Sequence, residues 1–101
     1  PSQLVYEDEQ VAAFRDLEPQ APVHVLVIPK KHVESLLALT AVDKDLISHI
    51  MIDVIPQLAK ELQVDEKGFR VVANTGDEGG QSVEHLHFHL LGGRSMQWPP
   101  G

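Results

Sequence analysis

The chain is 101 residues long, 43% of them hydrophobic, with 8 basic and 15 acidic side chains and a formal net charge of −7. That length supports one hydrophobic core, so we expect a single domain over residues 1–101. The sequence contains no cysteine, which excludes a disulfide scaffold and a thiolate site and favours a reducing compartment, so the expected location is the cytoplasm. The acidic charge disfavours binding to a nucleic-acid polymer, and neither a membrane span nor a signal-peptide pattern is present.

The first two predicted elements are the strands of a hairpin. Residues 3–6 favour a β-strand, an acidic turn follows at residues 7–9, and residues 11–14 form a second, apolar strand. Because prolines then interrupt regular structure within residues 18–22, we expect a loop there.

A buried strand is predicted next, over residues 23–28. This run is almost continuously apolar and rich in β-branched side chains, a pattern typical of a central strand that is covered on both faces. Pro29 follows the run and is expected to end it. We therefore expect residues 23–28 at the centre of a sheet.

Two helices are predicted between this strand and the next. The first is short, over residues 34–39, and Thr40 with Asp43 resembles a capping box that opens the second. Residues 42–62 form an amphipathic helix, because their apolar side chains recur at intervals of three and four. These side chains are Leu46, Ile47, Ile50, Met51, Val54, Ile55, Leu58 and Leu62. Pro56 lies inside this helix and is expected to kink or break it, since proline has no N–H for the preceding turn.

The last third of the chain contains two strands around a glycine-rich loop. Residues 69–74 favour a strand, and residues 75–82 contain three glycines that permit close approach of a ligand to the backbone. Residues 83–91 then alternate as a strand does. One face of this strand consists of Glu84, Leu86, Phe88 and Leu90, and the other of His85, His87 and His89.

The row of His85, His87 and His89 carries the chemistry, and three functions could use it. The first is a metal site, because neutral imidazole is a common ligand for zinc and similar ions. The second is a histidine face that only packs and hydrogen-bonds. The third is phosphoryl or nucleotidyl transfer, in which a central imidazole attacks phosphorus while a neighbouring imidazole donates a proton.

The neighbouring loop favours the third function. Glycine-rich turns present backbone amides to an anion, and Ser82 adds a hydroxyl, so residues 76–82 are expected to form an anion site. Asp77 and Glu78 would repel a phosphate, and we therefore expect both to point to solvent.

These residues resemble the signature of a known family. The run GGQSVEHLHFHLLGGR at residues 79–94 resembles that of the histidine triad (HIT) superfamily. The ending MQWPPG at residues 96–101 is similar to its Hint branch, the purine nucleoside phosphoramidases, and so is the run FRDLEPQAPVHVLVIPKKH at residues 14–32. The likeness covers nearly the whole chain and makes residues 1–101 a single HIT domain.

The resemblance implies an α+β fold, a five-stranded antiparallel sheet with one long and one short helix. It also implies a two-fold homodimer whose sheets join into ten strands, with Trp98 as a specificity contact across the dimer. No metal or other cofactor is required. The implied ligand is a purine nucleoside monophosphate or phosphoramidate.

The resemblance also implies catalytic roles for individual residues. His87 would attack the α-phosphate and become nucleotidylated, with its other ring nitrogen held by the main-chain carbonyl of His85. His89 would contact the phosphate or the bridging atom and help to protonate the leaving amine. His32 would complete the histidine cluster, and Ser82 would lie near the leaving group.

The nucleotide contacts are implied in the same way. Asp16 would accept hydrogen bonds from the ribose hydroxyls, while Phe14 and Leu17 would pack the purine. The whole implied set is Phe14, Asp16, Leu17, Asn74, Gly80, Gln81, Ser82, Val83, His87, His89 and Trp98.

The predicted reaction is hydrolysis of the P–N bond of adenosine or guanosine 5′-phosphoramidates in two displacements at His87. Hydrolysis of dinucleoside polyphosphates or other nucleotidyl conjugates, a non-catalytic nucleotide-binding regulator and a metal-binding module stay open as alternatives. Two features depart from the family pattern. Family members usually carry a short helical segment before the first hairpin, so the base pocket here either lacks a wall or gains it from outside this sequence. Pro56 lies in the helix that packs across the dimer axis.

Four basic or titratable residues outside this set have simpler interpretations. His24 lies on the buried strand and is expected to be a structural hydrogen-bonder. His49 lies on the long helix and is expected to be partly solvated. Lys30 and Lys31 follow a strand and are expected to lie at the surface.

Overall fold

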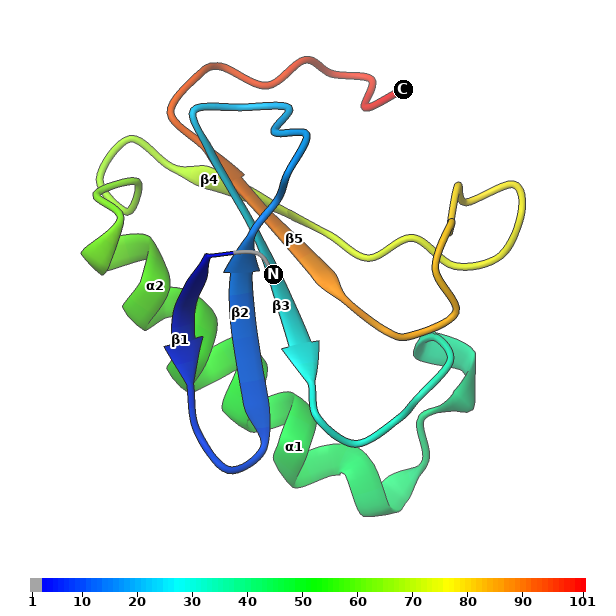
Figure 1. Cartoon of the computed structure of the whole chain (residues 1–101). Helices are drawn as coiled ribbons and strands as arrows, with labels where there is room; N and C mark the ends of the chain where they lie inside the picture. The colour runs from blue at the N-terminus through cyan, green and yellow to red at the C-terminus, as the bar shows by residue number, and fades with distance from the viewer. Residues whose placement is uncertain (1–2) are drawn as a thin grey trace.

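The computed structural model describes residues 3–101 and is built on an antiparallel sheet of five strands (Figure 1). The strands are β1 (Leu4–Glu7), β2 (Val11–Arg15), β3 (Val23–Pro29), β4 (Phe69–Val72) and β5 (Phe88–Gly92). Their order across the sheet is β1-β2-β3-β5-β4, so the predicted apolar strand β3 lies at the centre. The predicted α+β class, hairpin and central strand are confirmed.

A helical segment between β3 and β4 covers one face of the sheet (Figure 1). It consists of two 3₁₀ turns, η1 (Leu36–Ala38) and η2 (Ala41–Asp43), then α1 (Lys44–Ser48), the π-helical η3 (His49–Val54) and α2 (Ile55–Glu61). The predicted short helix is therefore a single 3₁₀ turn. The amide of Thr40 donates to the carboxylate of Asp43 at 3.0 Å, as in a capping box. Within residues 3–101, no helix is both long enough and apolar enough to cross a membrane.

Of the two outcomes predicted at Pro56, a kink or a break, the structure shows no break: the helix continues through this residue. Pro56 is the second residue of α2 and directly follows the π-helical turns of η3. The amide of Ile55 donates to the carbonyl of Ile50, five residues earlier. These wider turns make room for the proline ring, which in an α-helical turn would meet the carbonyl of Ile52. The helix therefore continues past Pro56 because its turns are wider just before this residue.

The buried core lies between the sheet and this helix. Val25 and Val27 of β3 and Phe88 and Leu90 of β5 point toward the helix, and none is more than 2% exposed. The predicted apolar stripe supplies the other side of the core, through Leu46, Ile50, Val54, Ile55 and Leu58. Met51 was predicted in that stripe but is 38% exposed, because the wider turns of η3 shift the period of the helix.

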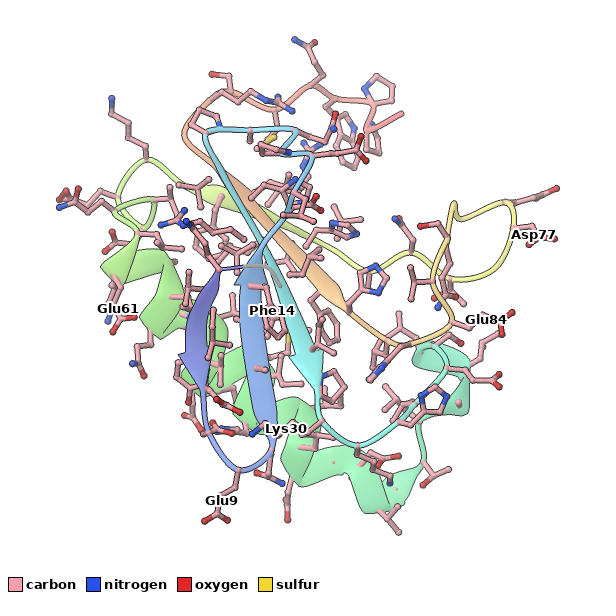
Figure 2. The ribbon with its side chains drawn as sticks, in the orientation of Figure 1. Glu9, Phe14, Lys30, Glu61, Asp77 and Glu84 are labelled. Atoms are coloured by element: carbon pink, nitrogen blue, oxygen red, sulfur yellow. The ribbon has the colours of Figure 1, made fainter. Side chains whose placement is uncertain are left out.

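The opposite face of the sheet carries a row of side chains that crosses four strands. Phe14 of β2 pairs with Leu26 of β3, Leu26 with His89 of β5, and His89 with Val72 of β4. Paired residues of antiparallel strands point to the same face, and all four are half-buried. Figure 2 shows Phe14 on this hairpin strand. The last histidine of the triad therefore shares a sheet face with the predicted purine contact.

Strand β5 is shorter than predicted, because residues 83–87 form a loop rather than part of the sheet. The amide of Leu86 donates to the carbonyl of Val33 at 2.7 Å, and the carbonyl of His85 accepts from the ring of His87. These bonds take the place of a sheet partner. The alternation of faces persists, since Leu86 is 1% exposed whereas His85 and His87 are half-buried.

Candidate active site

The ring of His87 is held in one tautomer by the backbone beside it. Its Nδ1 lies 2.7 Å from the carbonyl oxygen of His85, the contact that the resemblance implies. A carbonyl oxygen can only accept, so Nδ1 carries the proton and Nε2 presents a lone pair. His87 is half-buried and lies just before β5. In the neutral ring, Nε2 is therefore the nitrogen with an available lone pair.

His89 is held by a second histidine, His24 of β3. The Nε2 of His24 lies 2.9 Å from the Nδ1 of His89, and the Nδ1 of His24 accepts from the backbone amide of Gln20 at 3.0 Å. Since His24 accepts at Nδ1, its neutral form carries the proton on Nε2 and donates it to His89. His89 then accepts at Nδ1 and keeps a proton on Nε2. The chain of bonds leaves Nε2–H of His89 as a free donor.

Burial lowers the pKa of both members of this histidine pair. The pKa of His24 lies below its usual value because the ring is buried, an effect that the carboxylate of Asp16 partly opposes. Burial likewise lowers the pKa of His89, with further lowering from the charges of His87 and His24. Both rings are therefore held neutral at physiological pH, as the hydrogen-bond chain requires.

His85 and His32 form a second pair of histidines. The Nε2 of His85 donates to the carbonyl of Pro29 at 2.9 Å. This bond fixes the end of β3 against the loop of residues 83–87. The ring of His32 meets that of His85 edge to face, with centroids 5.1 Å apart. The rings of His87 and His89 are 5.0 Å apart in a similar arrangement. Within the triad, His85 therefore bonds to the end of β3, whereas the rings of His87 and His89 adjoin each other.

The glycine-rich loop is closed by its own amides, which changes the predicted anion site. The amide of Gly80 donates to Asp77, that of Gln81 to the carbonyl of Gly76, and that of Gly76 to the side-chain oxygen of Gln81. These three amides are thus not available to a phosphate. The amides and hydroxyl that follow, from Ser82 onward, remain as candidate donors. Asp77 and Glu78 are exposed, and Figure 2 shows Asp77 at the outer edge of the loop.

Gln81 braces this loop rather than offering a free amide group. Its Nε2 donates to the carbonyl of Glu34 at 2.6 Å and to that of Val83 at 3.0 Å. Both donor hydrogens are then in use. The implied phosphate role of Gln81 is therefore indirect, through the position of the residues that follow it.

The implied ribose and base residues lie around the end of β2. Asp16 accepts from the amide of Glu18 at 2.8 Å, and its other oxygen lies 3.4 Å from the Nε2 of His24. Leu17 is 80% exposed, so its side chain is open to a ligand. Asp16 thus joins the predicted ribose position to the histidine pair.

The remaining implied contacts lie on the loop and on the C-terminal tail. Asn74 is half-buried after β4, and Val83 is 57% exposed. Trp98 is 80% exposed, and the guanidinium of Arg70 lies 5.8 Å from the centre of its ring. These side chains are therefore partly or largely accessible, and the contacts described here do not connect them to the triad.

The family is decided by a match over nearly the whole chain. A model of the HIT domain matches residues 1–96, and the triad in that range has the tautomers described above. The chain belongs to the HIT family.

Relatives of this HIT chain support the assignment. An uncharacterized HIT-like protein of Synechococcus elongatus is 52% identical over 101 residues, which are 100% of this chain and 87% of the relative. The crystal structure of a HIT family hydrolase from Legionella pneumophila is similar with a TM-score of 0.97 at 46% identity, covering 100% of this chain and 89% of that one. A histidine triad nucleotide-binding protein from Candida albicans gives a TM-score of 0.81 at 33% identity, covering 98% and 75%.

A metal ion at the HIT histidines would be held by a different set of residues from the predicted row of His85, His87 and His89. Among residues 3–101, one group of three possible ligand atoms lies within 4.8 Å of one another, contributed by Asp16, His24 and His89. Only His89 belongs to the row of three. The same atoms already form the hydrogen bonds that orient His89. His87, the central histidine, is outside the group.

Two residues of the HIT site were missed or underestimated from the sequence. His24 was predicted to be a structural hydrogen-bonder, and it is one, but its partner is the triad histidine His89. Gln20 lies in the loop predicted over residues 18–22, and its amide sets the tautomer of His24. The spacing of His24 on a strand offered a signal, because a polar residue within a buried strand requires a partner.

Proposed function

We propose that this HIT protein hydrolyses purine nucleoside 5′-phosphoramidates through a nucleotidyl intermediate on His87. The observation that carries the proposal is the 2.7 Å bond from Nδ1 of His87 to the carbonyl of His85, because it leaves a nucleophilic lone pair on Nε2. The Legionella relative is described as a hydrolase and the Candida relative as nucleotide-binding. Both descriptions agree with this chemistry.

The first displacement forms a bond from Nε2 of His87 to the α-phosphorus while the P–N bond breaks. The leaving nitrogen takes a proton from solvent, near the exposed Ser82, and departs as the amine. His89, held neutral, contributes the hydrogen bond of its Nε2–H to the phosphate, where negative charge accumulates. The family role of proton donation is thus refined here to stabilisation by a fixed donor.

The second displacement releases the nucleotide. A water oxygen attacks phosphorus, the bond to Nε2 of His87 breaks, and the proton of the water passes to solvent. His87 returns to its starting tautomer because its Nδ1–H stays bonded to the carbonyl of His85 throughout. The cycle therefore requires no metal, reductant or other cofactor.

Asp16 and Phe14 are proposed to recognise the nucleoside. A carboxylate has about four lone-pair positions, so Asp16 can accept from ribose hydroxyls while it still accepts from the amide of Glu18. Phe14 lies in the row that contains His89, and Leu17 is exposed beside it in the sequence. The purine is proposed to pack on these two side chains.

We further propose that the protein is a homodimer joined through β4. This strand pairs only with β5 in the described chain, so its other edge has unpaired backbone groups. Phe69 is 39% exposed and Val71 36% exposed on it. A second copy that pairs along this edge would cover both side chains and give the ten-stranded sheet implied by the family.

The decisive test of the reaction compares two histidine variants on two substrates. His87→Ala removes the nucleophile, so turnover of adenosine 5′-phosphoramidate should fall to background while AMP binding stays measurable by calorimetry. His49→Gln, which changes a histidine outside the site, should keep turnover. Faster turnover of diadenosine polyphosphate than of the phosphoramidate would reject the proposed substrate, and unchanged turnover in His87→Ala would reject the mechanism.

A further inference from the structure

The segment that follows β5, residues 93–95, contacts the loop that precedes β3, residues 18–22. Strand β3 pairs with β5 so that Val23 lies opposite Gly92, and the start of one antiparallel strand lies beside the end of the other. Figure 1 shows both segments at the end of the sheet remote from the histidine-bearing loop that precedes β5. A contact made by residues 93–95 therefore acts directly on the loop that leads into His24.

Arg94 makes the first of these contacts through its guanidinium group. Its Nε donates to the carbonyl of Gln20 at 3.0 Å, and its Nη1 donates to the carbonyl of Ser95 at 3.0 Å. A planar guanidinium that is bonded to two acceptors has little rotational freedom left. The carbonyl of Gln20 is therefore bonded to a group that is itself held in place.

Gly93 makes a second contact between the same two segments. Its φ is +92°, and a Cβ placed on it would lie 2.9 Å from the Cβ of Pro22. The backbone at Gly93 therefore packs directly on the proline ring, a closeness that only glycine permits. The loop is thus held at two points, at Gln20 by a hydrogen bond and at Pro22 by packing.

The same residue that Arg94 holds also determines the tautomer of His24. The amide of Gln20 donates to Nδ1 of His24 at 3.0 Å, and Nε2 of His24 lies 2.9 Å from Nδ1 of His89. Only two backbone dihedral angles separate the amide of a residue from its own carbonyl. Because Arg94 fixes the carbonyl of Gln20, it also restricts where the amide of Gln20 points.

We propose that Arg94 is a positioning residue of the HIT site, which holds Gln20 so that its amide keeps the proton of His24 on Nε2. Its effect on turnover rests on the proposed function, whereas its effect on the tautomer of His24 does not. With a loosened amide, His24 is free to carry its proton on Nδ1, and its Nε2 then accepts instead of donating. His89 then loses the bond that leaves its own Nε2–H as a donor.

This role depends on contacts within one chain. Both bonds of Arg94 and the packing of Gly93 on Pro22 are made inside the same copy. The role therefore requires no open surface beside β4 and applies equally to a monomer and to the proposed dimer.

The first test follows the histidine tautomers of the ligand-free full chain by ¹⁵N NMR, because protonated and bare ring nitrogens differ in chemical shift. We expect the Nε2–H form of both His24 and His89 in the unchanged chain. Arg94→Met should raise the ratio of the Nδ1–H to the Nε2–H form of His24 about fivefold, the effect of losing one net hydrogen bond. Arg94→Lys keeps a donor and should restore most of the original ratio. Arg15→Met, which changes an exposed arginine on β2 outside this chain of bonds, should leave the ratio unchanged.

The second test measures turnover of adenosine 5′-phosphoramidate. Arg94→Met should lower kcat about 10-fold and change KM by less than about twofold. When Arg94→Met is added to His24→Leu, no further loss should follow, because the residue through which Arg94 acts is already absent.

A glycine pair keeps the role testable if Arg94→Met is unstable. Gly93→Ala leaves Arg94 in place but pushes on Pro22, so it should shift the tautomer ratio of His24 in the same direction. Gly68→Ala is its matched control, since Gly68 has a φ of +102° and open space for a Cβ. It should therefore leave the ratio unchanged.

Three outcomes would overturn the role of Arg94. They are an Nδ1–H form of His24 in the unchanged chain, an unshifted ratio in Arg94→Met or in Gly93→Ala, and a further 10-fold loss of kcat when Arg94→Met is added to His24→Leu. Tautomers that shift as expected in a chain that does not turn over the phosphoramidate would instead support this role and reject the proposed reaction.

Discussion

The Nε2 of His24 lies 2.9 Å from the Nδ1 of His89, and this contact determines which nitrogen of His89 keeps a proton. Because the amide of Gln20 occupies the other nitrogen of His24, only one tautomer of each ring satisfies the chain of bonds. His24 thus acts through His89 as a positioning residue. His24 of β3 and Gln20 of the loop before it therefore determine that Nε2 of His89, the proposed donor to the phosphate, carries a proton.

Replacing His24 should reduce turnover while leaving substrate binding nearly unchanged. In His24→Leu, His89 loses the partner that selects its tautomer, so kcat should fall by about 100-fold, with little change in KM. The pKa of His89 should rise, because His24 no longer donates a hydrogen bond that favours the neutral ring and no longer opposes its protonation electrostatically. Histidine NMR titration and the pH profile of kcat measure this shift. His32→Leu, which removes an exposed ring outside the bond chain, should leave the pKa of His89 in place, and an unshifted pKa in His24→Leu would contradict the assignment.

The contrast between β3 and His24 shows where sequence reasoning succeeds. The apolar run of β3 and the period of the long helix are local patterns, so both elements could be predicted from composition along the chain. The partner of His24 could not, because it depends on the antiparallel register that pairs Leu26 with His89. That register is a tertiary property.

What the sequence predicts is limited in the same way at the glycine-rich loop and at Pro56. Three glycines predict a loop that approaches a ligand, but they do not reveal that the amides of Gly76 and Gly80 bond within the loop. Likewise, proline predicts a disturbed helix, but only packing decides between a break and wider turns. The residue types indicate a loop and a disturbed helix, whereas the hydrogen-bond partners depend on the tertiary structure.

Gly79 should tolerate no side chain, although its backbone is not in the left-handed region. A Cβ there would lie 2.2 Å from the carbonyl oxygen of Thr75, a backbone atom that cannot move without rebuilding the loop. Gly79→Ala should therefore lower stability by about 1–3 kcal/mol and weaken AMP binding at least tenfold. Thermal unfolding and AMP calorimetry measure the two effects.

Gly80→Ala is the comparison for this prediction. Gly80 has a φ of +79°, but the space for a Cβ is open. Its substitution should cost about 1 kcal/mol from the backbone alone, with AMP binding largely kept. An equal loss of AMP affinity in both variants would show that close packing on Thr75 does not shape the phosphate loop.

Charge on the β4 edge should separate the proposed dimer. Val71→Asp places a carboxylate among groups that the second copy would bury, so light scattering should show the mass fall from twice 11.2 kDa to 11.2 kDa. Leu4→Asp, on the opposite edge strand β1 and 50% exposed, should remain dimeric. A mass of 11.2 kDa for the unchanged chain would rule out the dimer.

His49 joins the first hairpin to the long helix through two carboxylates. Its Nε2 lies 2.6 Å from Asp8 and its Nδ1 2.9 Å from Asp53, and these hydrogen bonds raise the pKa of His49. Burial alone would raise the pKa of Asp8, but bonds from Tyr6, His49 and two backbone amides outweigh it and lower that pKa well below its usual value. The expectation of a partly solvated His49 holds for its 27% exposed side chain, but the residue is also an ion-pair bridge.

This bridge should make stability depend on pH in a defined direction. A raised folded-state pKa means that the stabilisation by His49 is complete below its unfolded pKa of about 6.5 and is lost as pH rises through the folded value. His49→Gln should therefore cost about 1–2 kcal/mol at pH 6 and progressively less toward pH 9. Tyr6→Phe also removes a bond to Asp8, but the pKa of Tyr6 is raised to about 12, so its cost should stay constant over that range. Urea unfolding of both variants at pH 6, 7.5 and 9 measures the difference, and a pH-independent cost in His49→Gln would show that His49 is not charged in the folded protein.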